Sequence, residues 1–144
     1  MDDNVLAPID YLAVEFPGGH VTGDAFQSLM DVSRRGVIRV LDLEFIAKSA
    51  EGAVRKVALD ALTDATGVDV ALWQGAESGL LDQSDFDAVA FGIAPGSIAG
   101  ILVYEHIWAA PLIATIERSG AHVVGEGRIA ADNLLAALDS DERA

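Results

Sequence analysis

Cysteine is absent from this 144-residue chain, and basic residues are few: nine lysines and arginines stand against 23 aspartates and glutamates. Without cysteine the chain has no disulfide framework, no thiolate metal site and no cysteine nucleophile. The formal net charge of −14 repels the phosphates of nucleic acids and of anionic lipid surfaces. The composition therefore predicts no nucleic-acid partner.

A long uninterrupted hydrophobic run is also missing. The longest stretch without a charged residue, residues 88–104, contains Pro95 and three glycines and is short for a membrane span. The opening residues, MDDNVLAPID, lack the basic segment and apolar run of a secretory signal. We therefore expect a cytoplasmic protein with no transmembrane segment.

Hydrophobic residues make up 51% of the chain, enough for one compact domain with a real core. We expect a single domain over residues 9–139. A flexible acidic tail, residues 1–8, precedes it, and a frayed tail, residues 140–144, follows it. Glycines break residues 62–95 into short pieces, which indicates an insertion within the domain.

Five segments have the pattern of strands. Residues 9–16 and 98–105 are almost continuously apolar, which is typical of central strands. Residues 37–48 alternate between two faces, and residues 54–59 can pair back after the short connection SAEG. Residues 121–127, AHVVGEG, are expected to form the last core strand.

Helical spacing and capping residues predict four helices between these strands. They cover residues 22–35, residues 84–92 with Ser84 as the N-cap, residues 108–119 with Pro111 in the first turn, and residues 130–138.

The order of the elements predicts an α+β protein with a ferredoxin-like, split β-α-β antiparallel sheet and helices, plus a hairpin and a helical insertion between the two halves. In this arrangement we expect residues 9–16 and 98–105 to be adjacent and parallel at the centre of the sheet. Because both strands are apolar on both faces, the second face needs a cover. The insertion, the C-terminal helix and another subunit are the three alternatives.

Four segments carry a resemblance to a known family: PIDYLAVEFPG, GVIRVLDLEFIAK, PGSIAGILVYEHIWAAPL and HVVGEGRIAADNLLAALD. In the same order, from about residue 8 to 139, they resemble small acidic bacterial proteins, mostly actinobacterial, that are classed only as a domain of unknown function. The resemblance implies a ferredoxin-like core and no assigned activity.

One group of residues could carry chemistry. Glu15 ends the first strand and Glu105 ends the strand 98–105, so parallel neighbours would bring both carboxylates to one sheet edge. His106 and Trp108 follow Glu105, and His20 follows Glu15. Two carboxylates with histidines can bind a divalent metal or a small molecule, or act as an acid–base pair. The structural alternative is that each glutamate caps a helix or pairs with Arg34, Arg35 or Arg128.

Asp42 and Glu44 share one face of their strand and form a second, weaker candidate for a metal site. Alternating acids on a strand are more typical of a solvated face or of a cross-strand salt bridge, here to Arg55 or Lys56.

No phosphate-binding, serine-hydrolase or other catalytic motif is present, and no cofactor is indicated. The sequence therefore favours a non-enzymatic oligomerising or interaction module, a homodimer or larger homo-oligomer. The alternatives are a regulatory domain that binds a small molecule or divalent metal, or a small enzyme, using Glu15, Glu105 and His106.

Overall fold

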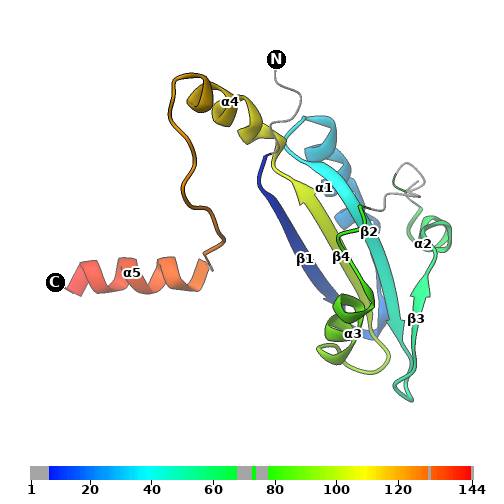
Figure 1. Cartoon of the computed structure of the whole chain (residues 1–144). Helices are drawn as coiled ribbons and strands as arrows, with labels where there is room; N and C mark the ends of the chain where they lie inside the picture. The colour runs from blue at the N-terminus through cyan, green and yellow to red at the C-terminus, as the bar shows by residue number, and fades with distance from the viewer. Residues whose placement is uncertain (1–6, 68–72, 74–77, 130, 144) are drawn as a thin grey trace.

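The computed structural model describes residues 7–67, 73, 78–129 and 131–143 (Figure 1). The predicted acidic tail therefore lies mostly outside the described residues. The strands are β1 (Ile9–Phe16), β2 (Arg39–Lys48), β3 (Val54–Val57) and β4 (Ile98–Glu105). The helices are α1 (Gly23–Arg34), α2 (Leu59–Thr66), α3 (Gln83–Phe91), α4 (Ala110–Arg118) and α5 (Ala131–Arg143).

The four strands form one antiparallel sheet in the order β1-β4-β2-β3. The predicted α+β class and the β2–β3 hairpin are confirmed. Since β4 is antiparallel to both of its neighbours, β1 and β2 run parallel to each other on either side of it. This is a split β-α-β unit, with α1 as the crossover helix.

The predicted parallel pairing of β1 with β4 is wrong, because the two strands are adjacent but antiparallel. The α1 crossover returns β2 parallel to β1 and leaves a gap one strand wide. A strand that enters this gap antiparallel to both neighbours makes perpendicular hydrogen bonds with each of them. Its apolar pattern is the same in either direction, so the sequence does not reveal the direction.

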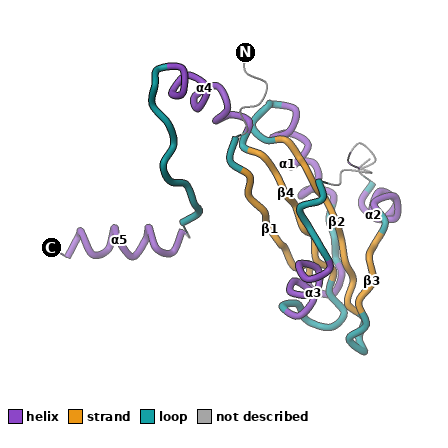
Figure 2. Tube along the Cα trace, viewed as in Figure 1, coloured by secondary structure: helices purple, strands orange, loops and turns teal. Residues whose placement is uncertain are grey.

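The predicted strand at residues 121–127 is also wrong. Residues 119–129, which we call the connector, contain no strand or helix and are exposed (Figure 2). Val123 and Val124 supply two strand-forming residues, but Gly125 and Gly127 follow at once and disfavour a strand.

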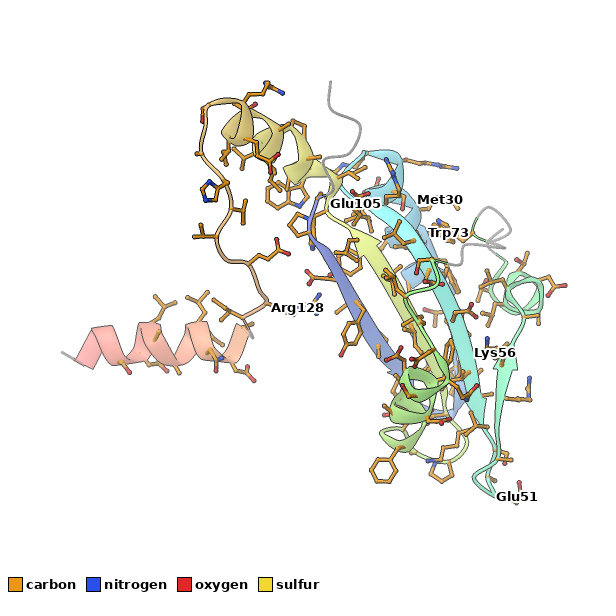
Figure 3. The ribbon with its side chains drawn as sticks, in the orientation of Figure 1. Met30, Glu51, Lys56, Trp73, Glu105 and Arg128 are labelled. Carbon is orange, nitrogen blue, oxygen red and sulfur yellow. The ribbon has the colours of Figure 1, made fainter. Side chains whose placement is uncertain are left out.

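Each face of the sheet has its own core. On one face Phe26 of α1 packs with Phe45, Leu62 and Trp73, and Figure 3 shows Trp73 on the α1 side of the sheet. On the other face Phe86 and Ala90 of α3, with Ile93 just after it, pack with residues of the two central strands: Ile46, Ala99 and Ile101. Of the three alternatives for the second face, the insertion therefore covers the part over β4 and β2.

Two helix boundaries differ from the predictions, and the start of α4 agrees with them. Asp82, not Ser84, is the N-cap of α3, and it forms a capping box with Asp85. Pro111 lies in the first turn of α4, as predicted. The last helix runs on to Arg143, beyond the predicted end at residue 138. Within the described part of the chain, no helix combines the length and apolarity that crossing a bilayer requires.

Candidate functional site

The antiparallel pairing separates the two predicted site glutamates. Glu15 lies opposite Ala99, whereas Glu105 lies opposite Ile9 at the other end of the same pair of strands. Glu105, His106 and Trp108 remain together, and Glu15 and His20 lie at the far end. The predicted single edge containing all five residues therefore does not exist.

Glu105 has structural partners. Its side chain is buried, its Oε2 accepts a 3.2 Å hydrogen bond from the backbone N–H of Ala7, and its Oε1 lies 3.6 Å from the guanidinium of Arg39. The Arg39 side chain is largely exposed, so solvent already screens its charge. The arrangement matches the structural alternative of an arginine partner, although the arginine is Arg39 rather than one of those predicted.

Glu15 also forms a hydrogen bond with a backbone N–H. Its Oε2 accepts a 2.8 Å hydrogen bond from the N–H of Ala94, in the loop between α3 and β4. His20 is exposed and follows the 3-10 turn Pro17–Gly19. At this end of the sheet, Glu15 therefore binds the loop that precedes β4, and His20 is exposed to solvent.

A polar and aromatic cluster lies at the other end of β1. It comprises Asp10, Tyr104, His106, Trp108 and Arg128, and we call it the Asp10 cluster. Asp10 Oδ2 lies 2.7 Å from His106 Nε2 and 3.3 Å from the guanidinium of Arg128. Arg128 also donates a 3.0 Å hydrogen bond to the Tyr104 hydroxyl. The Arg128 contacts fasten the end of the connector beside β1 (Figure 3).

The hydrogen bonds assign the tautomer of His106. The indole N–H of Trp108 can only donate, and it lies 3.2 Å from His106 Nδ1. Nδ1 is therefore the acceptor, so the neutral ring carries its proton on Nε2 and donates it to Asp10. Both ring nitrogens of His106 therefore have a partner within the cluster.

The electrostatics of the cluster favour an ionised Asp10. The hydrogen bond from His106, and after it the contact with Arg128, lower the pKa of Asp10 below its ordinary value of 3.8. At neutral pH the carboxylate therefore binds its two partners as an anion.

Asp10 and Tyr104 were not predicted from the sequence, and Arg128 was predicted only as a partner of Glu15 or Glu105, whereas it contacts Asp10 and Tyr104. The pairing of β1 with β4 brings Asp10 opposite Tyr104. An antiparallel assignment of these two strands would therefore have predicted that contact. Arg128 lies in the irregular connector, and no pattern in the sequence indicates its contact with β1.

The second candidate pair has a different environment from the predicted solvated face. Asp42 is buried, and its Oδ2 accepts hydrogen bonds from the hydroxyl and, at 3.0 Å, from the backbone N–H of Ser78. It follows a β-bulge between Val40 and Asp42. Among the residues that the structure describes, no group of three or more His, Cys, Asp or Glu side chains is placed to hold a metal ion.

An exposed, largely apolar surface surrounds β1. On the α1 face, a groove of about 320 Å³ runs between α1 and the sheet. On the α3 face, Tyr11 and Val89 help to line a hollow of about 440 Å³. The groove is lined almost entirely by apolar side chains, including Leu12, Val14, Phe16, Leu29, Val32 and Leu102.

The C-terminal part of the chain adds further exposed apolar side chains. In the connector, Val124 is 91% exposed. Figure 1 shows α5 lying apart from the sheet, and its three leucines, Leu134, Leu135 and Leu138, are all exposed. A helix of 13 residues is marginal in water without a packing partner.

The structure defines an α+β protein with an open antiparallel sheet, and among the described residues no strand pairs with the outer side of β1. A family of unknown function, DUF6325, matches residues 5–142, and since this is most of the chain, the chain belongs to that family. No curated protein and no solved structure matches it. Its role must therefore be argued from its own surfaces.

Proposed function

We propose that this protein is a non-enzymatic module that assembles with copies of itself into a homodimer or a larger homo-oligomer. The observation that carries the proposal is the surface around β1. There an apolar groove on one face and a hollow on the other meet a strand edge that has no partner in the part of the chain the structure describes. Soluble monomers rarely expose contiguous apolar patches of this kind, and such patches mark interaction surfaces.

Hydrophobic burial supplies the driving force for assembly. Covering apolar surface contributes roughly 25 cal/mol per Å². The exposed leucines of α5 and the valines of the connector enlarge the surface that a partner can cover. This gain must exceed the mutual repulsion of copies that each carry a formal charge of −14, so moderate salt favours assembly.

The polar residues support a structural role over a catalytic one. Glu15 and Glu105 each hold a backbone N–H, and both nitrogens of His106 are bonded inside the Asp10 cluster. A chain without cysteine does not need an oxidising compartment for its stability, which is consistent with a cytoplasmic location.

Light scattering on the purified full chain tests the proposal. At micromolar concentration and moderate salt, we expect a mass at least twice the 15.1 kDa of one chain. A mass of 15.1 kDa that does not change with concentration or salt would show that the chain covers its own apolar surface.

A further inference from the structure

The two edges of the sheet are built differently. At one edge, β3 has four residues, and two of them are the basic residues Arg55 and Lys56. Short length and basic side chains are the usual protection of an edge strand against pairing. At the other edge, β1 has eight residues that pair with β4 in an unbroken register, and it contains no proline, lysine or bulge. β1 thus lacks the short length and the basic side chains that protect β3.

We propose that the outer edge of β1 pairs antiparallel with β1 of a second copy, about a two-fold axis perpendicular to the sheet. The two sheets then become one continuous sheet across the dimer. This inference rests on the proposed self-assembly and identifies the surface that performs it. Such an interface is isologous, because the same strand contributes from both copies.

The positions of the charges in β1 suit this symmetry. Residues that face each other across such an axis lie on the same face of the sheet, so their residue numbers add up to an even number. Asp10 and Glu15 lie on opposite faces and therefore never come opposite each other. This matters in a chain of charge −14, because like charges directly opposite destabilise a strand pair.

Two registers give the largest overlap of the strands. With Ala13 on the axis, Leu12 lies opposite Val14 of the second copy on the α1 face, and the two apolar grooves become neighbours. With Leu12 on the axis, Leu12 of one copy lies opposite Leu12 of the other copy. In either register an exposed aliphatic side chain of β1 gains an aliphatic neighbour from the other copy.

The connector of the same chain is the competing occupant of this edge. Its glycines, Gly125 and Gly127, disfavour a strand, and it has no regular structure. Arg128 holds the connector through side-chain contacts to Asp10 at the start of β1 and to Tyr104, which lies opposite Asp10 near the end of β4. The backbone of β1 itself is a longer and more regular partner.

Engineered cysteines test the pairing, because the chain has none of its own. The variants are Ala13→Cys and Leu12→Cys, and the matched control is Val54→Cys on the other edge strand. Leu12 and Val54 are 43% and 46% exposed. Directly opposed residues of an antiparallel pair have Cα atoms close enough for a disulfide.

Each full-length variant is oxidised mildly at micromolar concentration, and the covalent dimer is followed over time. We expect Ala13→Cys or Leu12→Cys to cross-link at least about tenfold faster than Val54→Cys, because the paired thiols have a high effective concentration. Light scattering of the reduced variants and circular dichroism verify their assembly and fold.

The possible outcomes separate the two proposals. If the reduced variants are dimers but neither β1 cysteine links faster than the Val54→Cys control, self-assembly stands and the β1 pairing is refuted. If wild type and variants are all monomers, both proposals fail.

Discussion

At the residue scale, Asp10 joins two parts of the chain that are far apart in sequence. It binds His106, which follows β4, and Arg128, which ends the connector. Trp108 fixes the His106 ring by donating to Nδ1, so His106 is aimed at Asp10 in one tautomer. The Asp10 cluster therefore sets where the C-terminal part of the chain leaves the sheet.

The lowered pKa of Asp10 gives a pH-dependent prediction. The stabilising contribution of a carboxylate whose pKa is lowered on folding is present above its unfolded value, here about 3.8, and is lost as the pH falls through the folded value. We expect Asp10→Asn to unfold more easily in urea at pH 6, by about 1 kcal/mol after allowance for partial solvent exposure. As the pH falls below 3.8, the difference in stability from wild type should shrink progressively.

The control for this experiment is Asp139→Asn, an equal change of charge at an exposed position in α5. It should leave the stability nearly unchanged at both pH values. A stability gap for Asp10→Asn that stays constant from pH 6 to pH 3 would contradict the assigned role of the ionised carboxylate.

At the scale of elements, the start of α3 shows what N-cap preferences can predict from sequence and what they cannot. Asp82 and Ser84 are both good N-cap residues and are two positions apart, so residue type alone does not choose between them. The structure selects Asp82, because its side chain accepts from the N–H of Asp85 while the Asp85 side chain accepts from the N–H of Asp82. This reciprocal pair is a capping box.

The capping box leads to a second prediction. Asp82→Ala should measurably lower the free energy of unfolding, because an orphan N–H at the helix start loses its acceptor. Ser84→Ala should cost clearly less. Urea denaturation of the two variants measures the difference in unfolding free energy. If Ser84→Ala lost as much stability as Asp82→Ala or more, Ser84 rather than Asp82 would be the N-cap.

The strands show what sequence patterns can and cannot specify. β1 and β4 were correctly bounded because each is a continuous apolar run, and the glycines after Phe16 mark the end of β1. Their relative direction was wrong, since an apolar run reads the same both ways. Because of that error, Glu15 was predicted to lie next to Glu105 in a shared site. In the antiparallel register the two glutamates lie at opposite ends of the strand pair.

At the scale of the whole molecule, the asymmetry between the sheet edges is the main feature. β3 is short and basic, whereas β1 is long and apolar, with an apolar groove beneath α1 and a hollow beside α3. The sequence indicated excess apolar surface but did not show its location. The location of the apolar surface depends on which strand lies at the edge of the sheet, and the strand order is known only from the folded structure.

The central claim is that the chain assembles through this surface, and a matched pair of lysine variants tests it most directly. Val14 and Val54 are 47% and 46% exposed, and they lie on the two opposite edge strands. Val14→Lys and Val54→Lys thus make the same change of charge and size at equally exposed positions. Lysine on an edge strand opposes further pairing.

Sedimentation equilibrium of wild type and of both variants, at micromolar concentration and moderate salt, is the decisive measurement. We predict that wild type and Val54→Lys sediment with at least twice the 15.1 kDa mass of one chain, and that Val14→Lys sediments as a folded monomer. A Val14→Lys variant that assembles as well as Val54→Lys, or a wild type that is monomeric throughout, would contradict the account.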